Sequence, residues 1–436
     1  MVGFAFAQTK DHEIDSFMRA ANHAHFFNGT VLVARHDSIL VQKGYGYRDV
    51  EKKISHDSLS IFQIGSLSKS FTAICIMQQL EQGHLRLSDT LGYYFPFYKN
   101  GAQVTIEQLL THTGGIWEYS QDPDFMASIY TGHFTETAFW KLINDKPLDF
   151  SPGTKFHYSN TGYMILGYLL EKVTGRSYWQ LVREGIFQKA GMYTSGFDFA
   201  GLKSRYRCVG YETIFENPIQ PAQIVDSSYS FAAGAIYSTT GDLYRYSKAL
   251  LEGRLITHAS MEKAFKPVLQ NYGYGWTIEF PAGKRAVFHG GAIPGFLTLM
   301  SMLPDEHSCI ILISNNRDQE SNLQECYTSL LKILMNDPYV LPRLAVPLPV
   351  DNLVEYTGNY ELVDNKKFQG HLTLQDGQLM LQWNTDKIEK VFSEKKDLFF
   401  ITTYDLQLTF TRGQSGSING FTAHTAGKSF IYQKMN

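Results

Sequence analysis

Strand-like segments stand at both ends of residues 11–335 and enclose a stretch whose pattern is mostly helical. The expected strands cover 30–34, 39–41, 276–280, 286–289, 297–303 and 309–314. Strands so far apart in the chain can bury their apolar faces together in one antiparallel sheet. We therefore expect an α/β (α+β) fold over 11–335, in which helices flank that sheet and a helical lobe is inserted between its two halves.

Helical periodicity and end signals place the helices between these strands. The expected helices cover 12–27, the segment that follows Ser66, 105–110, 160–173, a segment from Thr240 onward and 319–335. Thr105 is the expected N-cap of the short helix, because its hydroxyl can accept from a free amide of the first turn. Gly175 is expected to close the helix at 160–173, since glycine readily takes the left-handed conformation that ends a helix.

Prolines break the pattern after residue 335. They are Pro338, Pro342, Pro347 and Pro349. They predict a stiff extended linker over 336–350, because proline cannot continue a helix. Beyond it, 351–436 alternates apolar and polar residues in short runs with glycine-containing turns, which predicts a small antiparallel barrel. Two domains agree with a length of 436 residues.

Composition excludes several classes of partner. The net charge is −3 and no run is rich in Lys or Arg, so nucleic acid is not an expected partner. We find no apolar stretch long enough to predict a transmembrane segment. Cys75, Cys208, Cys309 and Cys326 are too scattered for a disulfide framework, and no pair has metal-ligand spacing. Cys75 and Cys309 are expected to be buried free thiols, and nothing in the sequence indicates an oligomeric state.

The first ten residues resemble the tail of a secretory signal. Ala5-Phe6-Ala7 fits a small-x-small cleavage site, although a charged region and most of an apolar core are lacking before it. Residues 1–10 are thus interpreted as a signal-peptide remnant, which predicts a periplasmic or secreted bacterial protein. The alternative is a short apolar extension.

A serine and a lysine one helical turn apart carry the strongest chemical signal. Ser66 and Lys69 lie in Gly65-Ser66-Leu67-Ser68-Lys69, at the start of a helix on which Phe71, Ile74, Met77 and Leu80 are expected to form one apolar side. The lysine amine can then draw the proton from the serine hydroxyl and make it a nucleophile. Three other Ser-x-x-Lys matches, Ser260–Lys263, Ser329–Lys332 and Ser393–Lys396, lack this setting.

Several ordered motifs together resemble the serine β-lactamase-related family of class C β-lactamases, DD-peptidases, D-aminopeptidases and esterases. The matching segments are Asn28–Ala34, Gly65–Lys69, Leu109–Ile116, Tyr158-Ser159-Asn160, Tyr272–Trp276 and His289-Gly290-Gly291. The proline-separated 351–436 region resembles the lipocalin-like appendage of some members. That appendage could gate substrate, contact the cell wall or mediate dimerisation, or it could only stabilise the protein.

The resemblance assigns a role to each site residue. Ser66 is the nucleophile that carries the acyl group, and either Lys69 or Tyr158 is the base. Asn160 donates its amide to the substrate carbonyl or to Lys69. The backbone amides of Ser66 and Ala292 form the oxyanion hole. Gly290 and Gly291 let the substrate lie along a strand edge, whereas Trp276 either lines the cleft or packs in the core.

His289 stands where class C β-lactamases carry a lysine. A lysine supplies a permanent positive charge, whereas histidine is expected to titrate near neutral pH. The difference disfavours strong β-lactamase activity. We expect a serine hydrolase without metal or cofactor, acting on D-amino-acid peptides, including cell-wall peptide, or on small esters. The alternatives are a weak class C-like β-lactamase and a non-catalytic cell-wall or peptide binder.

Overall fold

The computed structural model describes residues 9–130, 132–215, 218–318, 320–384, 387–401, 406–425 and 428–435. The chain divides into two compact units, residues 1–339 and 340–436, so the division falls within the proline-rich segment. The predicted signal remnant lies almost entirely outside the described residues. No helix among the described residues is long and apolar enough to cross a membrane.

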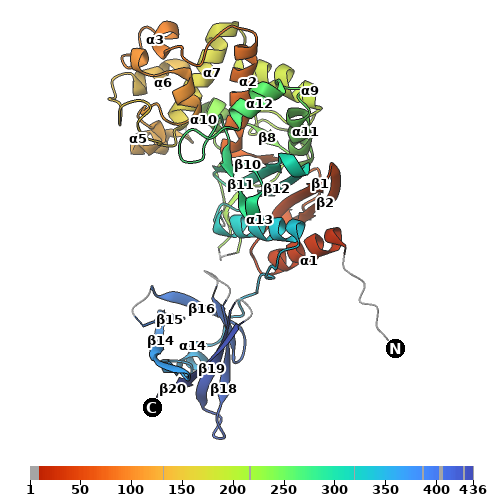
Figure 1. The fold of residues 1–436 in the computed structure, drawn as a ribbon, viewed down its shortest axis with the longest axis vertical. Helices are drawn as coiled ribbons and strands as arrows, with labels where there is room; N and C mark the ends of the chain where they lie inside the picture. Colours follow the sequence, from red (N-terminus) through yellow and green to blue (C-terminus); the bar gives the residue numbers. More distant parts are fainter. Residues whose placement is uncertain are drawn as a thin grey trace. The chain divides into compact units, whose positions relative to one another are not determined.

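One antiparallel sheet forms the centre of the first unit, and its strands come from both ends of that unit (Figure 1). In spatial order they are β2 (Ser38–Tyr45), β1 (Gly29–Arg35), β12 (Ser308–Ser314), β11 (Phe296–Leu303), β10 (Ala286–Ile293) and β9 (Thr277–Glu279). Val31 pairs with Leu312, which joins the N-terminal strands to the late ones as the sequence predicted. Strand β10 continues past its expected end at 289, because its hairpin with β11 keeps pairing as far as Ile293 and Phe296.

Both faces of this sheet are covered. On β12, Ile310 and Leu312 pack in the cluster with α1 (Lys10–His23) and α13 (Glu320–Met335). Ile311 and Ile313 face the opposite, larger cluster. A strand buried on both sides must be apolar at every position, which explains why this stretch shows no alternation of apolar and polar residues.

The larger cluster joins the sheet to a helical lobe (Figure 1). Its helices are α2 (Ser68–Glu81), α3 (Leu91–Tyr94), α4 (Ile106–Leu110), α5 (Pro123–Ser128), α6 (Glu136–Ile143), α7 (Asn160–Thr174), α8 (Tyr178–Val182), α9 (Gln188–Ala190), α10 (Ser227–Gly234), α11 (Thr240–Leu251) and α12 (His258–Ala264). The Thr105 cap of α4 is confirmed, since its hydroxyl accepts from the Gln108 amide. Gly175 ends α7 in the left-handed conformation, also as predicted.

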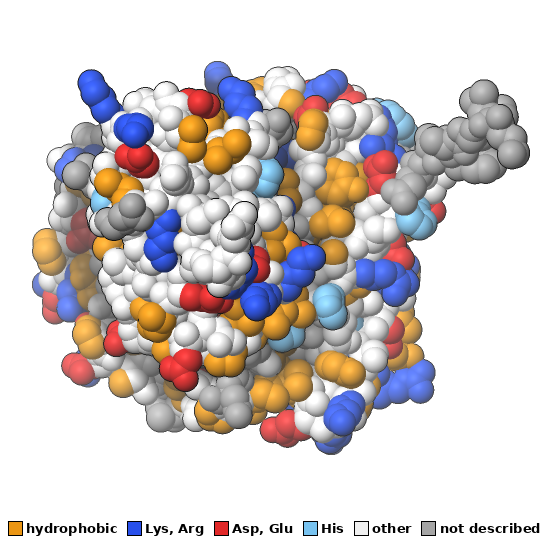
Figure 2. Space-filling view, turned by 90° about the horizontal axis from the view of Figure 1, so that it is seen from below, with side chains coloured by type: hydrophobic (Ala, Val, Ile, Leu, Met, Phe, Trp, Pro, Cys, Tyr) orange, Lys and Arg blue, Asp and Glu red, His pale blue; other side chains and the backbone are white. Residues whose placement is uncertain are grey.

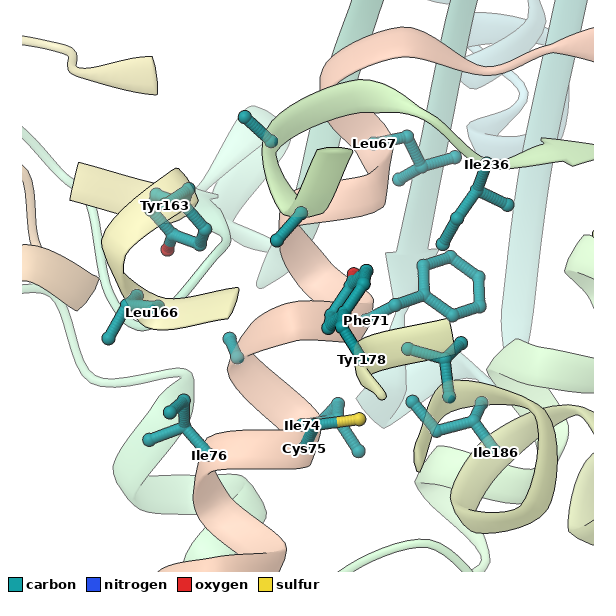
Figure 3. Packing of buried hydrophobic residues seen from close by; sticks show 14 of the residues in the cluster. Leu67, Phe71, Ile74, Cys75, Ile76, Tyr163, Leu166, Tyr178, Ile186 and Ile236 are labelled. Atoms are coloured by element: carbon teal, nitrogen blue, oxygen red, sulfur yellow. The ribbon is translucent and has the colours of Figure 1, made fainter. Parts of the chain in front are cut away.

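Helix α2 is buried on every side, which corrects the expected one-sided pattern. All of Ser68–Gln79 is buried, and apolar side chains surround the helix (Figure 3). Its polar residues find partners inside the core, as when Thr72 Oγ1 donates to the Ala232 carbonyl 2.6 Å away. The helix stands between the sheet and the lobe, so Lys69 and the preceding turn with Ser66 are attached to a rigid central element.

Short strand pairs complete the first unit. They are β3 (Tyr47–Asp49) with β4 (Ile54–Ser55), β5 (Phe62–Gln63) with β8 (Tyr237–Ser238), and β6 (Tyr211–Thr213) with β7 (Gln220–Pro221). The pairing of β5 with β8 joins the chain just before Ser66 to the chain just after α10. All four cysteines are buried and free, which confirms the expectation for Cys75 and Cys309.

The second unit begins with α14 (Val350–Val354) and continues as a closed antiparallel barrel. Its strands, each paired with the next, are β13 (Gly358–Leu362), β14 (Asn365–Gln375), β15 (Gln378–Trp383), β16 (Glu389–Lys395), β17 (Leu398–Ile401), β18 (Leu406–Arg412), β19 (Ile418–Thr425) and β20 (Lys428–Lys434). Strand β20 pairs back to β13. Aromatic side chains such as Tyr360, Phe410 and Phe421 pack against one another inside it.

On the face of the molecule shown in Figure 2, basic and acidic side chains are interspersed.

Candidate active site

Ser66 lies on a single tight turn, Gly65–Leu67, that leads directly into α2. Gly65 has φ +52°, and a Cβ there would lie 2.8 Å from the amide nitrogen of Ala292. A Cβ on Gly291 would meet the Ile64 carbonyl oxygen at 2.0 Å. Glycine at both positions therefore lets β10 approach the turn that carries Ser66 at backbone contact distance. This approach places Ala292 beside Ser66, although the two residues are far apart in the chain.

Lys69 is fully buried and has three polar contacts. Its Nζ lies 2.9 Å from Ser66 Oγ, 2.7 Å from Asn160 Oδ1 and 2.9 Å from the Ala233 carbonyl oxygen. Burial lowers the pKa of the lysine to about 7, and the more distant Glu118 carboxylate offsets this only in part. The amine is therefore partly neutral near pH 7, which is the condition for accepting a proton.

Asn160 connects Lys69 to a buried carboxylate. Its Oδ1 accepts from Lys69. Of the two roles expected for the Asn160 amide, donation to Lys69 is therefore wrong. Its Nδ2 donates instead to Glu118 Oε1 and Ser120 Oγ, both at 3.2 Å. Glu118 also accepts from the Thr161 backbone amide at 3.1 Å. With both ends of the amide engaged, Asn160 orients Lys69.

Glu118 and Ser120 were not identified from the sequence. Both come from the aromatic-rich 117–150 segment, in which the sequence alone distinguishes no functional position. The signal that could have identified Glu118 is a lone acidic residue inside an apolar and aromatic run, Ile116-Trp117-Glu118-Tyr119. A buried carboxylate in such a run needs several donors, and the first turn of α7 supplies two of them, the amide of Asn160 and the backbone of Thr161.

Tyr158 is the third polar group beside the nucleophile. Its ring centre lies 4.8 Å from Lys69 Nζ. Burial raises the pKa of its hydroxyl well above the usual range, and the contact with Ser66 opposes this only in part. The phenol therefore keeps its proton at neutral pH. His112 supports this segment, because its Nδ1 accepts from the Ser159 amide at 3.0 Å and its ring packs on Tyr158.

His289 is buried on β10 and is neutral. Burial, together with the nearby Lys69 charge, lowers the pKa of its ring to about 3, which corrects the expected titration near neutral pH. Its Nδ1–H must donate to the Gly290 carbonyl, because a carbonyl can only accept. Its Nε2 therefore accepts from the Tyr272 hydroxyl at 2.9 Å. The position thus supplies no positive charge for a substrate carboxylate.

Among the residues that the structure describes, the edge of β10 beside Ser66 has a strand partner only over its first three residues. Strand β9 pairs only with Ala286, Val287 and Phe288. Beyond them, Gly290 and Ala292 are exposed and Gly291 is partly exposed. An extended ligand can therefore lie along this edge and pair with its backbone.

A pocket of about 610 Å³ lies at the end of β10 beside Ala292. Its wall contains Tyr130, Glu212, Gln223, Ile293, Pro294 and Arg317, among other residues. Glu212 and Arg317 bring one acidic and one basic group to the same pocket. A ligand that reaches along β10 toward Ile293 would enter this polar space.

Trp276 does not line this cleft. It is fully buried and packs against Tyr246 and Phe265. Of the two expected positions for Trp276, core packing is therefore confirmed and lining of the cleft is wrong. The neighbouring Gly275 is the residue of this motif that approaches α2, since a Cβ there would lie 3.0 Å from the Lys69 carbonyl oxygen. Among the residues that the structure describes, no group of three His, Cys, Asp or Glu side chains is arranged to hold a metal ion.

Comparison with known proteins covers both units. The family model described as Beta-lactamase matches residues 14–334. "Penicillin-binding protein 4*" of Bacillus subtilis is 28% identical over 97% of this chain and 96% of its own length. "Putative penicillin-binding protein PbpX" of the same organism is 33% identical over 66% of this chain and 71% of its own length.

Solved structures share the fold. The octameric penicillin-binding protein homologue from Pyrococcus abyssi superimposes with a TM-score of 0.68 at 22% identity, covering 96% of this chain and 99% of that one. The D-amino acid amidase from Ochrobactrum anthropi, solved with L-phenylalanine amide, gives 0.65 at 22% identity over 74% of this chain and 99% of the amidase. At such identities the likeness concerns the fold alone.

Proposed function

The chain belongs to the Beta-lactamase family, and on this basis we propose that it hydrolyses D-amino-acid-containing peptides or small esters through an acyl-enzyme on Ser66. Membership makes it a serine hydrolase of the β-lactamase and penicillin-binding-protein type. The observation that carries the finer proposal is the contact of a buried Lys69 of lowered pKa with Ser66 Oγ.

The hydrogen bonds of Lys69 favour it as the base. A neutral amine has two N–H donors and one lone pair. Asn160 Oδ1 and the Ala233 carbonyl can only accept, so they take the two donors. The lone pair is then left for the Ser66 hydroxyl, which is the one contact able to donate. The protonated phenol of Tyr158 cannot serve as a base at neutral pH and is better suited to passing a proton onward.

The reaction then follows in balanced steps. The Ser66 O–H bond breaks, its proton passes to Lys69 Nζ, and Oγ forms a bond to the substrate carbonyl carbon. The carbonyl oxygen takes the electron pair and is stabilised by the amides of Ser66 and Ala292, each donor being worth about 3–4 kcal/mol. When the intermediate collapses, the C–N or C–O bond breaks and the leaving group takes the proton through the Tyr158 hydroxyl. Water then repeats the sequence on the acyl-enzyme.

The substrate class follows from β10. Its exposed edge suits an extended amide that pairs with the backbone of Gly290 to Ala292. The neutral His289 offers no cation to the carboxylate of a β-lactam, which favours peptides and esters over penicillins as substrates to be turned over. Likeness to a penicillin-binding protein over 97% of the chain supports the same choice.

Cell-wall peptide as a substrate implies a site of action outside the cytoplasm. We propose export to the periplasm or the medium, in keeping with the signal-like start of the chain. Fractionation of cells that make the protein from its native start tests this, and retention of the full-length chain in the cytoplasm would refute it.

Intact-mass measurement with excess penicillin is the experiment that tests the chemistry. We expect a lasting adduct on Ser66, together with hydrolysis of D-alanyl amides or p-nitrophenyl esters in separate assays. Ser66→Ala should lose both, whereas Ser329→Ala, at another Ser-x-x-Lys match on α13, should lose neither. Disappearance of the drug without an adduct would make the protein a β-lactamase. Ester and amide hydrolysis that survives Ser66→Ala would refute the proposal.

A further inference from the structure

A second cavity, larger than the pocket beside Ala292, lies in the helical lobe. Its volume is about 1030 Å³, close to the upper limit for small-molecule sites. Helices α6, α7, α8 and α10 contribute to its wall, together with the 192–198 segment. Ser66, Lys69, Tyr158, His289 and Ala292 are all absent from the described residues that line it. The cavity is therefore separate from the candidate active site.

Aromatic rings form much of its wall. Phe231 of α10 stacks on Tyr168 with ring centres 4.9 Å apart and meets Tyr178 edge-on at 5.0 Å. Trp179 and Tyr237 also line the cavity. Phe231 has φ +29°, an unfavourable backbone conformation for a bulky residue. Residues held in such conformations concentrate at ligand sites, where the surrounding packing maintains them.

Three carboxylates face the same space. They belong to Glu136, Glu171 and Asp198. Glu171 accepts from the Tyr178 amide at 2.8 Å, and Glu136 accepts from Trp140 Nε1 at 2.9 Å. Within the described ranges, none of the three carboxylates forms an ion pair. Burial and the Glu136 charge both raise the pKa of Glu171, so these two carboxylates, which line the same cavity, repel each other.

Basic side chains do little to neutralise this group. Arg183 lines the cavity, but its guanidinium lies over the Trp179 ring, 5.8 Å from the ring centre. His133, at the rim, pairs with Asp226 at 3.3 Å instead. An aromatic wall attracts cations through its ring faces, and unpaired carboxylates add a direct charge interaction.

We propose that this cavity, formed by Phe231, Tyr168 and Glu171 with their neighbours, binds a small organic cation whose ammonium group carries an apolar body. The apolar body packs against the rings, and the ammonium lies between the carboxylates of Glu136 and Glu171. The cation relieves the repulsion between the two carboxylates, so the ammonium adds to the binding that the apolar body provides. Binding here is independent of acylation at Ser66.

Calorimetry with three probes of one shape tests the charge requirement. The probes are 4-phenylbutylammonium, 4-phenylbutanol and 4-phenylbutyrate. We expect the ammonium to bind at least about tenfold more tightly than the alcohol, and the carboxylate to bind more weakly still. Equal affinity for all three would overturn the proposal, because the cavity would then select for apolar bulk alone.

Variants locate the bound cation. Glu171→Gln and Glu136→Gln each keep an acceptor for their hydrogen-bond partners, and each should weaken the ammonium about fivefold to tenfold without changing affinity for the alcohol. Glu184→Gln is the matched control, since that exposed residue pairs with Arg176. Thermal unfolding without ligand checks that the variants fold. An equal loss in Glu184→Gln would overturn the assignment.

Ser66→Ala protein separates this proposal from the proposed function. It should bind the ammonium with wild-type affinity even if every hydrolysis assay fails. Competition between the ammonium and a substrate for the site at Ser66 would show that the probe occupies the active site, and that result would overturn the inference.

Discussion

Lys69 in the first unit and Arg412 in the barrel are both cations held by hydrogen bonds, but their surroundings differ in charge. Lys69 is fully buried, and its three contacts are a hydroxyl, an amide oxygen and a carbonyl oxygen. Arg412 is 22% exposed and contacts two carboxylates, Glu355 at 2.6 Å and Asp397 at 2.7 Å. Neutral acceptors leave the charge of the lysine uncompensated, whereas the carboxylates compensate that of the arginine.

The difference shows how a fold lowers the pKa of an ordinary lysine into the range that suits a general base. Burial lowers the pKa of Lys69 to about 7, while hydrogen bonds from Arg412 to its two carboxylates raise the pKa of the guanidinium above its usual value. The first cation can lose its proton near neutral pH and the second cannot. The same interaction type, a charged donor with several acceptors, thus serves chemistry in one unit and stability in the other.

The largest expected effect is on hydrolysis. Lys69→Met removes the proposed base and should lower kcat/KM about 1000-fold, within the range for loss of general acid–base catalysis. Lys434→Met is the control, because that lysine donates to the Glu355 carbonyl in the barrel. Steady-state rates on an ester substrate measure both. Loss of less than tenfold in Lys69→Met would mean that another group is the base.

The same substitution should change how stability depends on pH. Lys69 has a pKa of about 7 when folded, against 10.5 for the free side chain, so between these values the unfolded chain binds the proton and the folded one does not. The wild type should gain stability over Lys69→Met across this window, by at most about 1.4 kcal/mol per pH unit. The uncompensated charge of Lys69 destabilises the folded protein most below pH 7. Parallel denaturant titrations from pH 6 to 10 measure the difference, and a constant difference would contradict a lowered pKa.

Arg412→Met removes the compensated cation and leaves two carboxylates facing each other. We expect a loss of about 1–3 kcal/mol in the stability of the barrel, between the values for exposed and buried ion pairs. Hydrolysis should stay at the wild-type level. Denaturant unfolding followed beside an activity assay checks both parts. A fall in kcat/KM that matches Lys69→Met would mean that the two cations do not have the separate roles assigned to them.

The smallest effect concerns the acid limb of the pH–rate profile. The Glu118 charge raises the pKa of Lys69, so Glu118→Gln should move the rise of kcat/KM to lower pH by less than about one unit. Glu252→Gln, which alters an exposed carboxylate, should leave the limb in place. A shift to higher pH in Glu118→Gln would show that the carboxylate acts on Lys69 through packing rather than charge.

Local pattern accounts for much of what could be predicted. The runs at 297–303 and 309–314 could be predicted as strands because a short, mostly apolar run indicates a buried strand, whichever strand it pairs with. Thr105 and Gly175 identify helix ends because caps depend on the residue itself. Ser66 and Lys69 share one side of a turn because their spacing on a helix requires it.

Long-range contacts decided what could not be predicted. Trp276 faces the core, where it packs against Tyr246 and Phe265, and nothing in its own motif reveals those partners. Glu118 contacts the first turn of α7 only after the lobe has folded, so its role is invisible along the chain. His289 is neutral because the fold buries it near Lys69.

The amino-acid order by itself determined the family motifs, the strand and helix positions and the pairing of Ser66 with Lys69, since these depend on residue type and spacing within a turn or a strand. Only the tertiary structure decided the charge states of Lys69 and His289, the hydrogen-bond partners of Asn160, the exposed edge of β10 and the cavity in the helical lobe. The physical reason is that desolvation and charge–charge interaction depend on distance in space, and folding brings together groups that the sequence separates.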